Sequence, residues 1–172
     1  RLVVDKIGNA KLLLAANIAK EEDIQECAKI IKELKLQEHV NIITNVPFAE
    51  IPSFLAAGEI AVISRPDCPG FPVKLLNYMA AGKAIVVFKG SAKKLQHMKN
   101  AYVVDDHDWK AMGEGIISLL ENPALAETLG KNAKQWVNEH LSWQNIAGKI
   151  EDVYYSLLER PTFLTQETKR LN

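Results

Sequence analysis

The chain has 172 residues, of which 48% are hydrophobic and 24% charged, and equal numbers of basic and acidic side chains leave no formal net charge. This length suits one domain with its own hydrophobic core, and the balanced charge predicts no general attraction to nucleic acid or to a membrane surface. The longest apolar runs are far shorter than a membrane-spanning helix and the first residues do not resemble a signal peptide, so we expect a cytoplasmic protein without a transmembrane segment.

The sequence predicts neither a disulfide framework nor a metal site. Cys27 and Cys68 form no CxxC pair, and the four histidines lack the spacing of metal ligands. An acidic cluster at 105–108 directly precedes a helical pattern. We interpret Asp106 or Asp108 as the N-cap of that helix and not as a metal ligand.

In the first part of the chain, short apolar runs alternate with helical patterns. Residues 11–16 predict a strand buried on both faces. Three acidic residues then open a helix whose apolar side chains recur at helical spacing over 24–34, and 40–44 predict a second strand. A short helix is expected at 51–57, with proline in its first turn and Gly58 at its end.

Two further apolar runs, 60–64 and 84–88, predict the third and fourth strands. Between them a loop at 65–70 leads into a helix that begins at about Pro72 and ends at Gly82. We expect this segment to hold the functional part of the chain.

The rest of the chain is mainly helical, with a fifth strand expected at 102–104. Asn122 and Pro123 begin one of the later helices, and Gly130 is expected to end it. The predicted helices of this part are 91–98, 109–120, 123–130, 132–140 and 143–158. Ser142 is the expected cap of the last one.

Strands that alternate with helices predict an α/β fold, here a Rossmann-like three-layer α/β/α domain with a mainly parallel sheet over 1–160. Residues 161–172 are expected to form a polar tail that is either mobile or docked elsewhere. In such a domain the loops after the strands meet at one edge, where ligands bind. The loops concerned are 45–47, 65–71 and 89–91.

The segment 70–72 would let the backbone approach a ligand, and the first helical turn at 73–76 would offer free N–H groups to a phosphate. The alternative is that Gly70 only makes a tight turn. Asn77 is placed to hydrogen-bond a ribose, or simply faces solvent.

Arg65 and Lys74 would offset phosphate charge, or are simply solvated. Phe71 and Tyr78 are interpreted as packing groups, and Cys68 has no acidic or histidine partner nearby in the sequence. No paired carboxylates or nucleophile arrangement can be identified.

Residues 69–83, PGFPVKLLNYMAAGK, occur together with three later motifs at 120–123, 129–133 and 141–143. As a set, and over nearly the whole chain, they resemble the C-terminal domain of the retaining, nucleotide-sugar-dependent glycosyltransferases called group 1 or family 4. The resemblance implies the C-terminal half of a GT-B fold, in which two Rossmann-like domains face each other.

By this resemblance, backbone N–H groups around Leu75 and Leu76 hold the donor phosphates, and the loop at Val46 meets the base. The family usually has glutamates where this chain has Pro69 and Asn77, although Asn77 keeps the capacity to hydrogen-bond a ribose hydroxyl. The residues expected to bind the nucleotide sugar are Val46, Arg65, Gly70, Phe71, Pro72, Leu75, Leu76 and Asn77. No catalytic residue is assigned.

The family also has an arginine and a lysine that neutralise the donor diphosphate, and Arg1 and Lys6 have that spacing. Alternatively, residues 1–7 are the end of a preceding helix, since too few residues separate them from the strand at 11–16 for a crossover helix. In either case the first strand of the domain is missing or truncated, which predicts a fragment of a longer enzyme.

The function implied is retaining transfer of a sugar from a UDP- or GDP-sugar to an unidentified acceptor, without a cofactor, a metal or nucleic acid. A missing N-terminal domain would bind the acceptor, a glycan, lipid or small molecule, so this chain alone is expected to be inactive. The full-length protein would be cytoplasmic or peripheral at a membrane. The alternatives are a non-catalytic binding or assembly module and a nucleotide-sugar epimerase of the same architecture.

Overall fold

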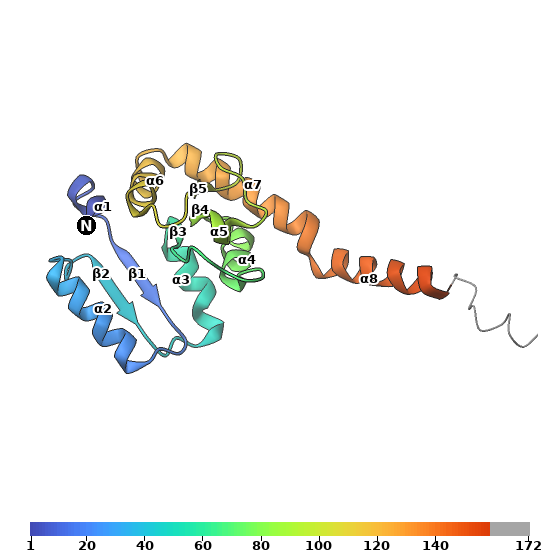
Figure 1. Ribbon diagram of the computed structural model, residues 1–172, viewed down its shortest axis with the longest axis horizontal. Helices are drawn as coiled ribbons and strands as arrows, with labels where there is room; N and C mark the ends of the chain where they lie inside the picture. The colour runs from blue at the N-terminus through green and yellow to red at the C-terminus, as the bar shows by residue number, and fades with distance from the viewer. Residues whose placement is uncertain (159–172) are drawn as a thin grey trace, which may run out of the picture. The chain divides into compact units, whose positions relative to one another are not determined.

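The computed structural model describes residues 1–158, so the predicted tail at 161–172 lies outside the described residues. The chain divides into two compact units, residues 1–135 and residues 136–172. All strands of the described part belong to the first unit, and they pair in parallel in two separate sheets (Figure 1). The predicted α/β class with parallel strands is therefore confirmed.

The first sheet pairs β1 (Leu12–Ala15) with β2 (Val40–Ile43), and α2 (Glu21–Glu33) connects the two strands. The prediction of a first strand buried on both faces is wrong. Every residue of β1 is exposed. Its sheet has only two strands in the described part of the chain, and pairing with β2 fills one edge of β1 without covering either of its faces. The leucines are 46%, 36% and 38% exposed at Leu12, Leu13 and Leu14.

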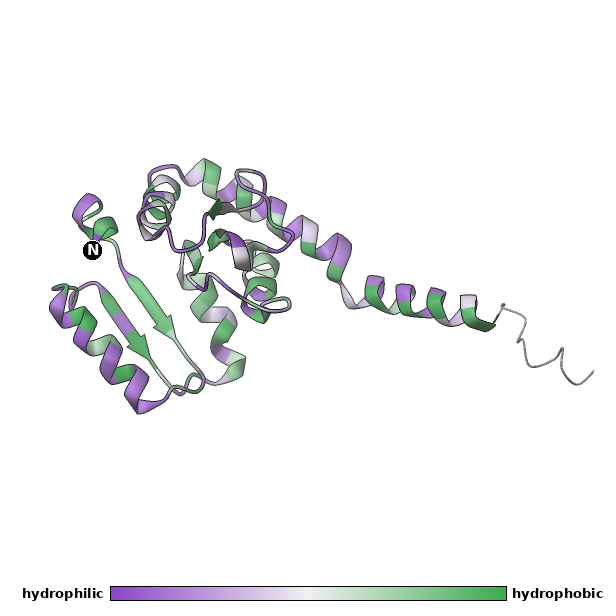
Figure 2. Cartoon of the chain, viewed as in Figure 1, coloured by the Kyte–Doolittle hydropathy of each residue, from purple (hydrophilic) through white to green (hydrophobic). Residues whose placement is uncertain are grey.

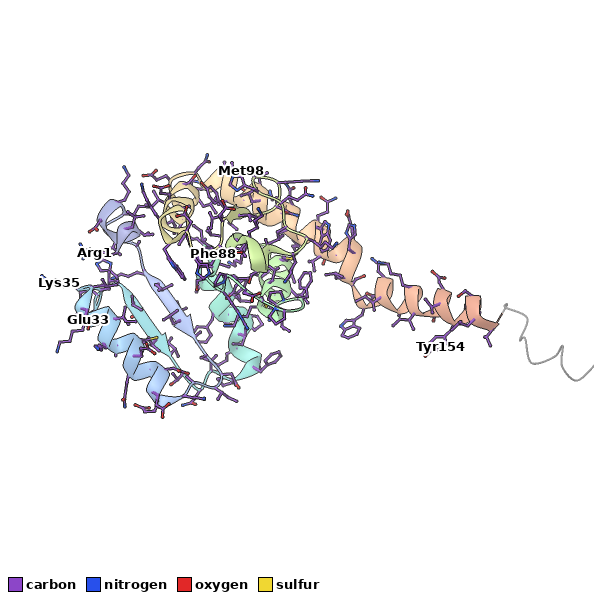
Figure 3. The ribbon with its side chains drawn as sticks, viewed as in Figure 1. Arg1, Glu33, Lys35, Phe88, Met98 and Tyr154 are labelled. Carbon is purple, nitrogen blue, oxygen red and sulfur yellow. The ribbon has the colours of Figure 1, made fainter. Side chains whose placement is uncertain are left out.

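The second sheet has the order β3-β4-β5, formed by Ile60–Ile63, Ala84–Phe88 and Tyr102–Val104. All five residues of β4 are buried, as expected for the central strand of a covered sheet. Phe88, labelled in Figure 3, lies in the core at the end of β4. Its ring centroid is 4.8 Å from that of Trp109, in an edge-to-face arrangement. Burying a side chain of this size contributes roughly 1.5–3 kcal/mol.

The other helices of the first unit that precede α7 lie before, between and after the strands. They are α1 (Leu2–Lys6), the 3₁₀ turn η1 (Phe48–Glu50), α3 (Ile51–Ala57), α4 (Val73–Ala80), α5 (Lys89–Ala92) and α6 (Trp109–Glu121). The predicted end of α3 at Gly58 and the end of the next helix near Gly82, which has a φ of 69°, are confirmed. The predicted helix at 91–98 is wrong, because Lys93 adopts a φ of 56° and ends α5 after one turn.

Asp108 is the N-cap of α6, since its Oδ1 accepts a hydrogen bond from the Ala111 N–H at 2.8 Å. The other candidate, Asp106, instead accepts a hydrogen bond from the Gly90 N–H at 2.8 Å. Within residues 1–158, no group of three or more acidic, histidine or cysteine side chains is arranged to hold a metal ion.

The helix α7 (Pro123–Leu141) runs without a break, so the prediction that Gly130 ends a helix is wrong. A Cβ on Gly130 would lie 2.1 Å from the Gly82 carbonyl oxygen, and the missing side chain is what lets α7 approach the turn before β4. The neighbouring Leu129 and Ala133 are fully buried. Their burial offsets the cost of a glycine inside a helix, about 1 kcal/mol.

In the second unit the structure describes the end of α7 and α8 (Trp143–Leu158), which confirms the predicted last helix. Ser142 caps α8, because its Oγ accepts a hydrogen bond from the Asn145 N–H at 3.3 Å. Trp136 stacks on His140 with ring centroids 4.6 Å apart. Among residues 1–158, no helix is both long and apolar enough to cross a bilayer.

Candidate functional site

The loops that follow β3 and β4 are joined by hydrogen bonds at the carboxyl edge of the second sheet. The buried Ser91 donates from Oγ to the Arg65 carbonyl at 2.5 Å, and the Lys93 ammonium donates to the Cys68 carbonyl. A Cβ on Gly90 would lie 1.8 Å from the Pro66 carbonyl oxygen, so the two loops are in direct backbone contact. This contact fixes the path of the chain into the next helix.

That helix, α4, presents its first turn at the same edge. Gly70 turns the chain at a φ of 78° with no atom near the place of a Cβ, and Pro72 is the N-cap. The N–H groups of Val73 and Lys74 have no acceptor within residues 1–158. These two groups and the positive end of the helix dipole form a place that suits an anion.

The two N–H groups assigned to the donor phosphates, those of Leu75 and Leu76, both donate to the Pro72 carbonyl, at 3.0 and 3.4 Å. Leu75 itself is fully buried and anchors α4 to the core together with Met79. The free donors of this turn therefore lie one to two residues earlier than the resemblance implies.

The side chains of Phe71 and Asn77 are exposed on this surface, at the entrance of α4 and one turn further along it. Arg65 is also exposed, and its Nε donates to the Asp67 carbonyl at 2.9 Å, which bends the side chain over its own loop. Arg65 follows β3 and the 70–77 segment leads into and along α4, so both belong to the connection between β3 and β4.

Val46 belongs to the first sheet, where it follows β2. It is buried, its N–H donates to the Ala16 carbonyl at 3.1 Å, and its carbonyl accepts a hydrogen bond from Asn17 Nδ2 at 2.8 Å. These bonds tie the loops after β1 and β2 to each other. Val46 is thus at a carboxyl edge, as predicted, but at that of the other sheet.

Arg1 and Lys6 lie at the two ends of α1. Arg1 forms an ion pair with Asp5 at 2.5 Å, which raises the pKa of Arg1 and lowers the pKa of Asp5 through their hydrogen bond. Lys6 Nζ lies 3.9 Å from Glu121 Oε1 of α6. Their conformation is the helical one that the second interpretation of residues 1–7 predicts, and their role at a diphosphate stays a prediction.

Sequence reasoning placed a loop at 89–91 near the site but missed the residues that connect it. Ser91 is buried and hydrogen-bonded to a residue 26 positions away, and Lys93 reaches a carbonyl 25 positions away. The only local signal was their position directly after a fully apolar strand. Contacts over such separations leave no pattern in the sequence.

Two hollows of the first unit lie away from this edge. One of about 500 Å³ is lined by α1 and α6, including Leu2, Lys6 and Glu114, and one of about 230 Å³ is lined by Ile60 and Ala84, where β3 and β4 begin. The carboxyl-edge residues line neither of these two hollows.

Comparison with known proteins identifies the fold and the family. Residues 2–136 match the family described as glycosyl transferases group 1. An uncharacterized glycosyltransferase of Methanocaldococcus jannaschii is 25% identical over 139 residues, which are 80% of this chain and 35% of that protein. The chain spans about a third to two fifths of the length of the curated relatives it matches.

Solved structures give the same result. The Anabaena protein HepE in complex with UDP superposes with a TM-score of 0.78 at 20% identity, over 90% of this chain and 44% of that one. The C-terminal domain of a group 1 family glycosyl transferase from Francisella tularensis gives a TM-score of 0.72 at 20% identity, over 83% of this chain and 75% of that one. These likenesses confirm the fold expected for the C-terminal half of a GT-B protein, and with the sequence match they show that the chain belongs to the group 1 glycosyl transferases.

Proposed function

We propose that this chain binds the nucleoside diphosphate part of a sugar donor at the carboxyl edge of the second sheet, for transfer of the sugar to an acceptor. The observation that carries the proposal is the first turn of α4, where the N–H groups of Val73 and Lys74 have no acceptor among the described residues and the chain turns at Gly70 with a φ of 78°. The match of residues 2–136 to the group 1 glycosyl transferases supports sugar transfer as the reaction.

The chemistry requires stabilisation of a departing diphosphate. In the transfer, the bond between the anomeric carbon and the diphosphate oxygen breaks, the acceptor oxygen bonds to that carbon with retention of configuration, and the acceptor hydroxyl releases its proton. Negative charge grows on the diphosphate as the bond breaks, and prearranged N–H donors at a helix N-terminus stabilise such charge. The exposed Arg65 would add a cation beside the same turn.

The donor base and ribose would lie on either side of this turn. Asn77 is exposed on α4 and offers an amide to a ribose hydroxyl, while the buried backbone of Val46 would border the base. The UDP complex of HepE supports a uridine nucleotide as the first choice, and a GDP-sugar is the second. The acceptor would be bound by a further domain, because the chain spans only part of its relatives.

Titration calorimetry of the full-length protein with UDP, GDP and UMP tests this proposal. We expect UDP or GDP to bind at least about tenfold more tightly than UMP, because the second phosphate is what the α4 turn would hold. Gly70→Ala would weaken diphosphate binding, since alanine is strained at a φ of 78°, whereas Gly8→Ala is the matched control at an open position. Equal binding of UMP and UDP would contradict the proposal.

A non-catalytic binding module is the second candidate, because Pro69 and Asn77 stand where the family usually has glutamates. Turnover of a labelled donor by the full-length protein would exclude that candidate. A nucleotide-sugar epimerase would convert the donor without any acceptor, so analysis of the products formed from donor alone separates epimerisation from transfer.

A further inference from the structure

Positive charge is concentrated in one part of this chain, although its formal net charge is zero. Of the 21 basic residues, six lysines fall within residues 68–104, which contain no aspartate or glutamate. Four of these lysines lie close together in the sequence, between positions 89 and 99. A local excess of one sign attracts the opposite sign to one surface, even where the whole molecule is neutral.

The excess is greatest in the segment that leads from α5 to β5. We call residues 93–99 the basic loop, and Figure 2 shows the hydrophilic colour in this part of the first unit. Its three lysines, Lys93, Lys94 and Lys99, are all exposed. Within residues 1–158, none of the three forms an ion pair with a carboxylate. Lys93 donates only to the neutral carbonyl of Cys68, so its charge is not neutralised.

The backbone of the basic loop is held in place from inside. Leu95 and Asn100 are buried, and the Asn100 Oδ1 accepts a hydrogen bond from the Gln96 N–H at 2.7 Å. Asn132 of α7 donates from Nδ2 to the Lys99 carbonyl at 2.7 Å. The loop therefore presents its charged side chains from a fixed backbone, and little conformational entropy is lost when they meet a partner.

An apolar side chain, Met98, stands among these charges. Met98 is 48% exposed, has a φ of 58° and lies at the periphery of the first unit (Figure 3). Its N–H donates to the Ala101 carbonyl at 2.9 Å, which closes the turn at this point. An anionic bilayer offers partners to both kinds of side chain, since its headgroups attract lysines and its acyl boundary accepts apolar groups. A soluble polyanion would use the lysines but not the methionine.

We propose that the basic loop is a contact with an anionic membrane surface. Lys94 and Lys99 would lie among the lipid headgroups, and Met98 would enter the boundary of the acyl chains. Each lysine near such a surface strengthens binding roughly fivefold. The contact is peripheral and does not depend on the nucleotide chemistry of the carboxyl edge.

Sedimentation of the full-length protein with lipid vesicles provides the test. The vesicles contain phosphatidylcholine alone, or phosphatidylcholine and phosphatidylglycerol in equal amounts. We expect Lys94→Gln/Lys99→Gln to weaken binding to the anionic vesicles at least about tenfold. Lys20→Gln/Lys32→Gln is the matched control, because it removes two exposed lysines of the α2 region and leaves the same net charge. It should change binding less than about twofold.

Several results would overturn the proposal. Equal weakening by the two double variants would show an effect of net charge and not of the basic loop. Unchanged binding of Lys94→Gln/Lys99→Gln would show that the loop makes no contact. Wild-type protein that binds both kinds of vesicle equally would exclude a role of the lysines, because attraction to anionic headgroups requires the phosphatidylglycerol.

Met98→Gln distinguishes a bilayer from a soluble polyanion. We expect this variant to bind the anionic vesicles several-fold more weakly and to bind inorganic polyphosphate like the wild type. Ile18→Gln is the control for an exposed apolar side chain elsewhere, since Ile18 is 86% exposed. Vesicle binding of Met98→Gln equal to that of the wild type would overturn the bilayer as the partner. All substituted side chains are exposed, so we expect an unchanged Tm in every variant, and any lost binding then reports the contact itself.

Discussion

At the scale of single residues, Gly90 joins the two loops of the candidate site. Because a Cβ there would meet the backbone of Pro66 and not a flexible side chain, Gly90→Ala requires one loop to move. We expect Gly90→Ala to lower the free energy of unfolding by about 1–3 kcal/mol or more, measured by urea denaturation, and to weaken nucleotide binding. Gly8→Ala, where a Cβ meets nothing within 4 Å, should change stability by less than about 1 kcal/mol. Equal effects of the two substitutions would refute the packing argument.

Tyr78 of α4 gives the fold a dependence on alkaline pH. Burial raises the pKa of its phenol above the usual value of about 10. Below that usual pKa the stability contribution is complete, and it is lost as the pH rises towards the folded-state pKa, because the unfolded chain releases the proton first. Urea denaturation at about pH 8 and about pH 10.5 should show a smaller loss of stability for Tyr78→Phe than for the wild type. The exposed Tyr154→Phe is the control, and an unchanged pH dependence in Tyr78→Phe would contradict this assignment.

At the scale of elements, helix propensity and packing predict opposite effects of substituting Gly130 in α7. Propensity alone predicts that Gly130→Ala stabilises the helix by about 1 kcal/mol. The contact with the Gly82 carbonyl predicts the opposite sign, since the added Cβ would lie 2.1 Å from that oxygen. We expect a net loss of about 1–3 kcal/mol by thermal or urea unfolding. Gly148→Ala in α8, where a Cβ meets no atom within 4 Å, should be neutral or stabilising. A stabilised Gly130→Ala variant would show that α7 can move away from the turn.

Most elements could be predicted from local signals in the sequence. The apolar run at Ala84–Phe88 and the helix ended near Gly82 agree with the structure, as does the capping serine before α8. The sequence predicts a helix end at Gly130 because the residue that Gly130 packs against, Gly82, lies 48 positions earlier in the chain. The positive φ of Lys93, which shortens α5, has no signature in its residue type either.

At the scale of the whole molecule, the α/β class followed from the alternation of strands and helices, and the family followed from a set of motifs that occur in a fixed order along the chain. The match of residues 2–136 to the group 1 glycosyl transferases confirms the family. The candidate site was predictable as an edge and as the Gly70 turn. Its N–H donors were not, since the Pro72 carbonyl takes up the two that the resemblance assigned. The exposure of β1 was also not predictable from its residues. An apolar run indicates that a strand is suited to burial, but it does not show whether other elements cover that strand.

Sugar transfer is a property that we expect only of the full-length protein. Residues 1–172 should transfer no sugar to any acceptor in a labelled-donor assay, because the chain spans only about a third to two fifths of the length of the relatives it matches. The full-length protein, assayed in parallel, is the positive control. Transfer by residues 1–172 at a rate comparable to that of the full-length protein would contradict this expectation.

The exposed leucines of β1 also have a consequence for how the separate chain behaves in solution. Its isoelectric point is about 7.1, so at neutral pH the molecules do not repel one another electrostatically. Exposed leucines on a strand, without electrostatic repulsion between molecules, favour association between copies of the chain. The solubility of residues 1–172 should therefore pass through a minimum near neutral pH and rise on either side of it, where like charge keeps the leucine edges of different molecules apart.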